Sequence, residues 1–75
     1  MEDHADSLRE LGKRIALMRR KQGFSQESFA AHAGMDRSYM GGIERGKRNI
    51  TFYVLCQIAT ALQCDVAKLT RGLPS

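Results

Sequence analysis

The chain has 75 residues, and its 12 lysines and arginines outnumber its 8 aspartates and glutamates, which gives a formal net charge of +4. A chain of this length supports one hydrophobic core of moderate size, so we expect a single domain over residues 1–75. It has no secretory signal, no apolar run long enough to span a membrane and few cysteines. These features argue against a membrane protein or a disulfide scaffold and favour the cytoplasm.

The first predicted helix covers residues 8 to 21 or 22. Its apolar residues recur at spacings of three and four, as on a helix with one buried face: Leu8, Leu11, Ile15 and Met18. Ser7 and Glu10 have the spacing of an N-terminal capping box, and Gly23 ends the helix. We expect residues 1–6 to form a loose tail.

Two short helices with a glycine between them are predicted next. Ser25 can cap the first, and Gly34, which reaches positive φ without strain, ends it after about two turns. Asp36 can cap the second, which Gly46 stops. The side chains of the second helix that face inward are expected to be Met40 and Ile43. Helices joined by a short turn that contains glycine match the description of a helix-turn-helix, here at about 26–45.

Gly41 and Gly42 stand together inside the second of these helices, where each costs about 0.5–1 kcal/mol relative to alanine. Stability alone does not favour them. We hypothesise that one face of this helix comes close to something bulky, either the first helix or the floor of a DNA groove. Gly41 is therefore expected among the positions that contact bases. A bent or frayed short helix is the alternative.

Two further helices complete the prediction. Thr51 can cap a fourth helix, and its apolar stripe consists of Leu55, Ile58, Ala59 and Leu62. Asp65 can cap a last short helix that carries Val66 and Leu69. Residues 72–75 contain the only proline and are expected to be loose. No segment has the alternation of a strand, so the predicted fold class is all-α with five helices.

Several segments resemble the helix-turn-helix proteins of the phage repressor and Cro group, also called the Xre family. The segments are LGKRIALMRRKQGFSQESFA, GMDRSYMGGIERGKRN and VLCQIATAL, and together they extend from about Leu11 to Leu69. The IERGK end is the most specific of them. Within the family, DRSYMGGIERGKRN is most similar to the small controller proteins of restriction-modification systems. The resemblance implies a compact five-helix bundle that binds DNA.

The resemblance also implies roles for individual residues. Arg19 and Glu44 match a pair that forms a partly buried ion pair, which makes Arg19 structural. Gln26 matches a glutamine that grips a phosphate and braces the recognition helix. The residues that match the loop that binds the DNA backbone are Arg45, Lys47, Arg48 and Asn49, and a base contact by Arg48 is a lesser alternative. The family commonly has a glycine where this chain has Gln63, so positive φ is expected there.

The start of the recognition helix is expected to read bases, because side chains at its N-terminus project toward base edges. Arg37 can donate to both O6 and N7 of guanine, and Ser38 can bond either type of base. A salt bridge from Arg37 to Asp36 or another carboxylate is the alternative. Tyr39 can reach phosphate or sugar, or it can pack against the preceding helix.

Homodimerisation is expected because one recognition helix reads only a few base pairs, whereas two related by a twofold axis fit successive major grooves of a palindromic operator. The apolar residues that exceed the needs of a small core are assigned to the interface: Phe52, Tyr53, Val54 and Leu69. The alternative is that most of this set simply completes the core.

The remaining chemistry is sparse. Cys56 and Cys64 have no partners at the spacing of metal ligands, so we expect no zinc, and both should be reduced. No nucleophile, base and orienting acid stand at a recognisable spacing, so we predict no enzyme, no cofactor and no small-molecule ligand. The predicted function is a regulator that binds specific double-stranded DNA. The alternative is an antitoxin or adaptor whose main partner is a protein.

Overall fold

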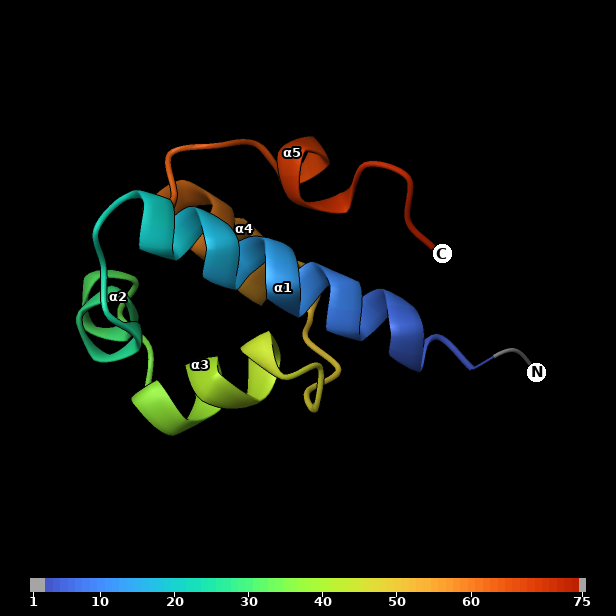
Figure 1. Cartoon of the computed structure of the whole chain (residues 1–75), viewed down its shortest axis with the longest axis horizontal. Helices are drawn as coiled ribbons and strands as arrows, with labels where there is room; N and C mark the ends of the chain where they lie inside the picture. Colours follow the sequence, from blue (N-terminus) through green and yellow to red (C-terminus); the bar gives the residue numbers. More distant parts are fainter. Residues whose placement is uncertain (1–2, 75) are drawn as a thin grey trace.

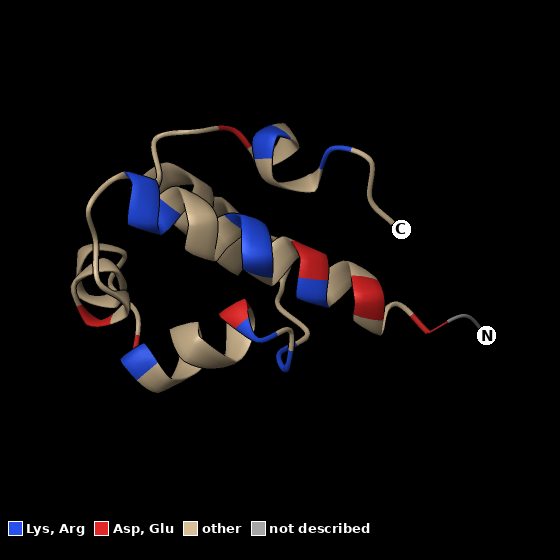
Figure 2. Ribbon diagram, viewed as in Figure 1, with Lys and Arg blue, Asp and Glu red and all other residues tan. Residues whose placement is uncertain are grey.

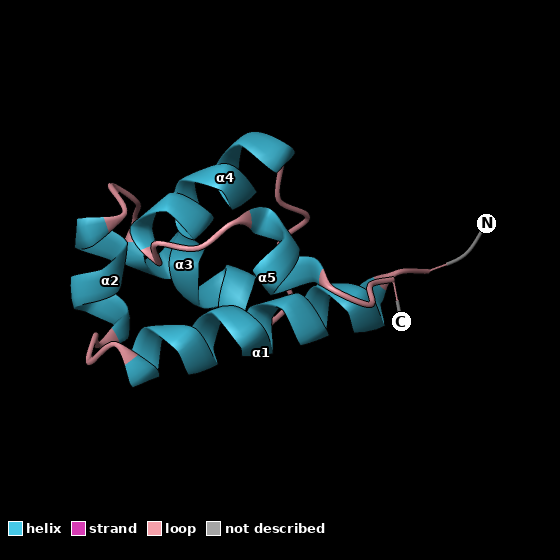
Figure 3. Ribbon diagram, turned by 90° about the horizontal axis from the view of Figure 1, so that it is seen from above, coloured by secondary structure: helices cyan, strands magenta, loops and turns pink. Residues whose placement is uncertain are grey.

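Five helices and no strand make up residues 3–74, which the computed structural model describes. The helices are α1 (Ala5–Lys21), α2 (Gln26–His32), α3 (Arg37–Glu44), α4 (Phe52–Ala61) and α5 (Val66–Thr70). Figure 1 shows α3 along the lower edge of the molecule, below α1, with α5 above. Seen from above, α1 and α4 lie along opposite edges (Figure 3). The all-α, five-helix prediction is confirmed.

One core joins all five helices. The largest fully buried side chains are Ile15, Phe29, Met40, Ile58, Leu62 and Leu69, and every helix supplies at least one of them. Complete burial of a side chain of this size stabilises the fold by about 1.5–3 kcal/mol. The predicted inward faces of α1, α3 and α4 are the faces that enter this core. Met40 and Ile43 are both buried, as expected.

The predicted caps of the four later helices are present. The side chains of Ser25, Asp36, Thr51 and Asp65 each accept a hydrogen bond from the backbone N–H three residues on, at 3.0, 3.1, 3.1 and 2.9 Å respectively. Gly34 and Gly46 adopt positive φ of 71° and 74° where they end α2 and α3. Gln63 also has positive φ, at 59°, which confirms the expectation for this position and carries a steric cost that a glycine avoids.

The predicted start of α1 is wrong. The helix begins at Ala5, so Ser7 lies inside its first turn and does not form the expected N-terminal capping box with Glu10. The N-cap residue is His4, whose side chain makes no cap bond, and Asp3 instead accepts from the Ala5 N–H at 3.0 Å. The carboxylate of Asp3 therefore moves the start toward the N-terminus. Of the predicted loose tail, residues 1 and 2 lie outside the described residues.

The end of α5 and the residue after it are held on α1, just before the C-terminal tail. Arg14 donates to the carbonyl oxygens of Leu69 at 3.1 Å and Arg71 at 2.7 Å. Leu73 packs against the core. Residue 75 lies outside the described residues.

The backbones of α1 and of the end of α3 touch at two glycines, Gly12 and Gly46, and the sequence predicted only the helix-ending role of Gly46. A Cβ on Gly12 would lie 2.4 Å from the carbonyl oxygen of Glu44, and one on Gly46 would lie 2.7 Å from the Cα of Arg9. Gly41, by contrast, faces side-chain ends: its Cβ would lie 3.2 Å from both Gln26 Oε1 and Arg45 Nη1. The close approach between α1 and α3 is therefore made at Gly12 and Gly46.

Gly12→Ala should reduce the free energy of unfolding by about 1–3 kcal/mol or more, because the methyl group meets backbone that cannot yield without moving α3. Gly41→Ala is the matched control: the side chains near it can shift, and helix propensity favours alanine by about 0.5–1 kcal/mol. Urea unfolding followed by circular dichroism measures both. Equal stability losses in the two variants would contradict the assignment.

Candidate nucleic-acid interface

The helix-turn-helix consists of α2, a turn at Gly34, and α3. Arg37 and Ser38 open α3 and are exposed, while Met40 and Ile43 on its opposite face enter the core. The loop that follows α3 exposes Lys47, Arg48 and Asn49. Figure 2 shows basic residues at both ends of α3, along the lower edge of the molecule. This face therefore presents α3 with Arg37 at its start and a group of cations after its end.

A buried ion pair fixes α3 to α1. Arg19 Nε lies 2.7 Å from Glu44 Oε2 and Arg19 Nη2 lies 2.8 Å from Glu44 Oε1, and the two side chains are only 9% and 6% exposed. Arg19 also donates to the Phe24 carbonyl oxygen at 3.1 Å, which ties in the loop before α2. The hydrogen bond to Glu44 raises the pKa of Arg19. The structure thus brings together the two residues expected to pair.

Gln26 extends this pair toward the exposed start of α3. Its Nε2 donates to Glu44 Oε1 at 3.1 Å, and its Oε1 accepts from Arg37 Nη1 at 3.2 Å. Arg37 is therefore held by Gln26, and not by the carboxylates that were its expected alternative partners. Since a guanidinium has five N–H donors, one bond to Gln26 leaves most of them available.

Tyr39 and Arg48 form a second contact on this face. The Tyr39 ring is half-buried and packs against the core. The guanidinium carbon of Arg48 lies 5.2 Å from the centroid of that ring, a cation–π distance. The stem of Arg48 lies next to Gly42, where an added Cβ would be 3.0 Å from Arg48 Cγ. Gly42 thus leaves space for Arg48 to cross α3.

The position of Gly41 differs from the expectation that this residue contacts bases. It is buried, and the side chains of Gln26 and Arg45 cover it, so in this arrangement it offers no surface to a base. Arg45 is exposed at the C-cap of α3. The two glycines therefore give room to long polar side chains, and one of these, Gln26, belongs to α2, the first helix of the pair, which was one of the two expected neighbours.

The residues assigned to a dimer interface divide into two groups. Phe52 is 70% exposed and Tyr53 is 79% exposed, and Val54 beside them is half-buried. Leu69 is 0% exposed, so its assignment to the interface is wrong. Leu69 is the buried apolar side chain that packs α5 against the core. Only the start of α4 therefore presents large apolar side chains from the predicted set.

The described residues contain no group of three or more His, Cys, Asp or Glu side chains that could hold a metal ion. Cys56 and Cys64 are both free thiols and partly buried. Burial raises the pKa of the Cys64 thiol. Within residues 3–74, no helix is both long and apolar enough to cross a bilayer.

Comparison with known proteins places this geometry among DNA-binding regulators. The model of the helix-turn-helix family HTH_3 matches residues 15–69. The control protein C.MunI of a Mycoplasma species is 42% identical over 53 residues, which cover 71% of this chain and 72% of C.MunI. The restriction-modification controller protein C.AhdI of Aeromonas hydrophila has a crystal structure that matches with a TM-score of 0.82 at 41% identity, over 85% of this chain and 97% of C.AhdI.

A third match is the structure of SinR, a master regulator for biofilm formation, in complex with DNA. It has a TM-score of 0.74 at 32% identity, over 79% of this chain and 95% of SinR. None of these three proteins is named as an enzyme. The predicted similarity to restriction-modification controller proteins is confirmed.

Removing one member of the Arg19–Glu44 ion pair should lower the stability of the fold. Glu44→Ala leaves the Arg19 charge buried without its partner, and should lower the free energy of unfolding by about 3–5 kcal/mol. The double variant Arg19→Met with Glu44→Leu should recover most of this loss, because it leaves no buried charge. Urea unfolding measures all variants.

The matched control is Glu10→Gln. Its partner Arg14 lies at 3.1 Å, but the two side chains are 41% and 28% exposed. Exposed pairs contribute about 0–1 kcal/mol, so this variant should unfold almost as the parent does. If Glu44→Ala were no less stable than Glu10→Gln, the structural role of the buried pair would be refuted.

Proposed function

This chain belongs to the helix-turn-helix family and is a DNA-binding regulator, and we propose that it acts as a homodimer on a palindromic operator. We further propose that it is the controller of a restriction-modification system. Its similarity to C.MunI and C.AhdI supports this second proposal. It acts as a repressor or an activator according to where the operator lies relative to the promoter.

The observation that carries the proposal is the exposed start of α3. Arg37 and Ser38 are exposed at the start of α3, the end of the helix that faces base edges when such a helix enters the major groove. Arg37 donates to guanine O6 and N7, and Ser38 bonds a neighbouring base. The bond from Arg37 to Gln26 orients the guanidinium before DNA is bound.

Gln26 has a double role in this proposal. One amide N–H is used by Glu44, and the second is free to donate to a phosphate at the start of α2, where backbone N–H groups also favour anions. The same side chain holds Arg37. A phosphate contact and a base contact are therefore coupled through one amide group.

The polar and basic residues around α3 are proposed to hold the DNA backbone. The residues in this set are Tyr39, Arg45, Lys47, Arg48 and Asn49. Arg48 crosses α3 beside Gly42 and lies over the Tyr39 ring, so it reaches the groove edge from a supported position. Phosphate contacts of this kind set affinity and its salt dependence, and they carry little sequence information.

Dimerisation gives the protein enough contacts for specificity. Two recognition helices about 34 Å apart fit successive major grooves on one side of the duplex. We assign the interface to the first turn of α4, at Phe52, Tyr53 and Val54. Exposed aromatic side chains of this kind are frequent at the centres of protein interfaces.

In vitro selection of bound DNA from a random pool tests the whole proposal. The recovered sequences should contain a palindrome whose half-sites are about one helical turn, or 10 base pairs, apart. Recovery of a single half-site would refute the dimeric mode. Failure to enrich any sequence, together with a stoichiometric protein partner on purification, would favour an antitoxin or adaptor.

Two substitutions should separate base reading from backbone binding. Arg37→Ala should remove about 1–3 kcal/mol of discrimination at one base pair of each half-site. Lys47→Ala should weaken binding to all sequences similarly, and reduce the slope of log K against log salt by about one unit. Titrations of operator and mismatched DNA at several salt concentrations measure both effects. A uniform loss in Arg37→Ala, with discrimination intact, would show that Arg37 reads no base.

A further inference from the structure

We infer that Gln57 of α4 is a positioning residue for base reading: it holds the carbonyl oxygen of Ala33, at the turn between α2 and α3, and thereby fixes the start of α3. Gln57 lies outside the set of residues proposed to touch DNA. The inference rests on the proposed function and deepens it, because it names a residue that acts on Arg37 without contacting the duplex. Three features carry it: how the two ends of α3 are held, which partner the Ala33 carbonyl needs, and how Gln57 reaches it.

The two ends of α3 are held to the rest of the fold in different ways. At the C-terminal end, Glu44 forms the buried ion pair with Arg19, and its carbonyl oxygen lies against the backbone of α1 at Gly12. The N-terminal end follows the turn at residues 33–36. In the described part of the chain, only one hydrogen bond joins this turn to an element other than α2 and α3, and Gln57 donates it. Gln57 thus supplies at one end of α3 the polar contact that the ion pair supplies at the other.

Much of the apolar packing at the start of α3 is made by methionine side chains. Met35 in the turn packs against the core while partly buried, and Met40 in α3 is fully buried. A methionine side chain is unbranched and flexible, so it adapts to small shifts of its surroundings. A hydrogen bond is directional and weakens steeply when its geometry is disturbed. The bond from Gln57 therefore restricts the turn more strongly than the methionine contacts do.

Helix geometry leaves the carbonyl oxygen of Ala33 for a partner outside α2. Ala33 is the C-cap residue, and the last carbonyls of a helix lie beyond the reach of its own N–H groups. The N–H groups of the turn, at Gly34 and Met35, bond carbonyl oxygens earlier in α2. Ala33 is only 8% exposed, and a buried carbonyl group without a partner costs free energy. Gln57 therefore satisfies a group that the turn itself does not.

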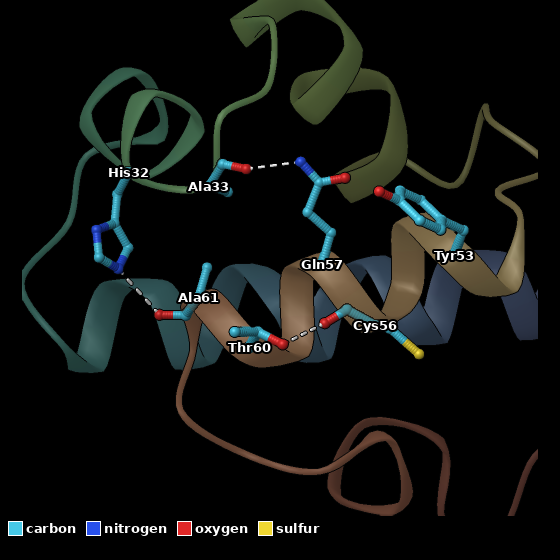
Figure 4. A pocket seen from close by; sticks show the side chains of 7 residues that line it. All are labelled: His32, Ala33, Tyr53, Cys56, Gln57, Thr60 and Ala61. Carbon is cyan, nitrogen blue, oxygen red and sulfur yellow. Dashed lines mark hydrogen bonds between the residues drawn. The ribbon is translucent and has the colours of Figure 1, made fainter.

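Gln57 reaches the turn across a hollow between α4 and α2 (Figure 4). The hollow has a volume of about 490 Å³, and Ala33, Gln57 and Thr60 are among the residues that line it. Gln57 Nε2 lies 2.8 Å from the Ala33 carbonyl oxygen, and a Cβ on Gly34 would lie 3.7 Å from the same nitrogen. Within residues 3–74, no other side chain of α4 makes a hydrogen bond to another element. The amide thus lies against both residues at which the chain turns toward α3.

A second contact joins α2 to α4 along the same hollow. His32 Nε2 lies 3.2 Å from the Ala61 carbonyl oxygen, and the His32 ring stacks on Phe24 with 4.9 Å between the ring centroids. His32 belongs to the last turn of α2, whereas the carbonyl carbon of Ala33 is bonded to the nitrogen of Gly34 in the turn. The contact of His32 therefore holds the helix, and the contact of Gln57 acts directly on the turn.

The start of α3 is close to the turn along the chain, because Arg37 comes four residues after Ala33. A shift of the turn is therefore passed to the side chain that is proposed to read guanine. A bidentate contact to guanine needs two directional hydrogen bonds made together, so it is sensitive to such a shift. Contacts to phosphate depend more on charge and carry little sequence information. Loss of the Gln57 bond should thus reduce discrimination between bases and spare binding to unrelated DNA.

Gln57→Met tests the inference, because methionine has a similar length and no side-chain N–H to donate. The probe is the DNA recovered by in vitro selection, together with the same DNA changed at the base pair where Arg37→Ala loses discrimination. The ratio of the two dissociation constants should fall about two- to tenfold in Gln57→Met, which is the range that one hydrogen bond typically contributes. Binding to unrelated DNA should be unchanged.

Two variants are the matched controls, and all variants are compared at a temperature where circular dichroism shows them folded. Thr60→Val changes the same hollow, but the Thr60 hydroxyl donates to the Cys56 carbonyl oxygen of its own helix at 2.8 Å, so the ratio should not change. Gln57→Lys keeps an N–H donor on a long side chain, so it should retain most of the ratio, even though its added charge strengthens binding to all DNA.

A bond that only stabilises the fold would give a different result. In that case Gln57→Met would unfold at a lower urea concentration but keep the full ratio while folded. That outcome, or equal losses in Gln57→Met and Thr60→Val, would overturn the inference and leave the proposed function standing. If the parent protein does not distinguish the two DNAs, or if selection recovers no sequence, the proposed function and this inference fail together.

The free protein gives a second readout that needs no DNA. In proton–nitrogen correlation spectra, the backbone amide signals of Arg37 and Ser38 should move in Gln57→Met and keep their parent positions in Thr60→Val. Unmoved signals in Gln57→Met would show that the start of α3 does not depend on Gln57, and would overturn the inference whatever the DNA titrations give.

Discussion

The bond between Arg19 and Glu44 is the interaction on which the geometry of the nucleic-acid interface depends. Two charges with little exposure to water are costly to bury, and the cost is offset only when both are fully hydrogen-bonded. Here the carboxylate is bonded by Arg19 and by Gln26, and the guanidinium reaches Phe24 as well. The pair therefore joins α1, the loop before α2, the start of α2 and the end of α3, and any shift of α3 would break several bonds together.

The same network connects the interior to the proposed base-reading side chain. From Arg19 the bonds run through Glu44 and Gln26 to Arg37, from a buried residue to an exposed one. Ordering a long side chain before binding reduces the entropy that is lost when the complex forms. A fold of this size thus uses one set of polar contacts both for stability and for the orientation of the side chain that we propose to read DNA.

Most local features were predictable from the sequence, the start of α1 being the exception, and features made by distant residues were not. Ser25, Asp36 and the other caps act on N–H groups three residues away, so their spacing is visible in the chain. The burial of Leu69 and the hold of Arg14 on the C-terminal segment depend on how α5 returns to α1, about 55 residues away in the sequence. The pairing of Arg19 with Glu44 was anticipated only through resemblance, because no spacing reveals a contact across 25 residues.

The contact at Gly12 limits how this protein can change its preferred DNA sequence in the course of evolution. Where two helices are separated by side chains, repacking can tilt one against the other in small steps. At Gly12 the backbones of α1 and α3 are in direct contact, so no side chain lies between them whose size a substitution could change. In the binding mode proposed above, altered preference must then come from exchanging residues on the exposed start of α3, one at a time, while the angle of α3 in the fold is kept.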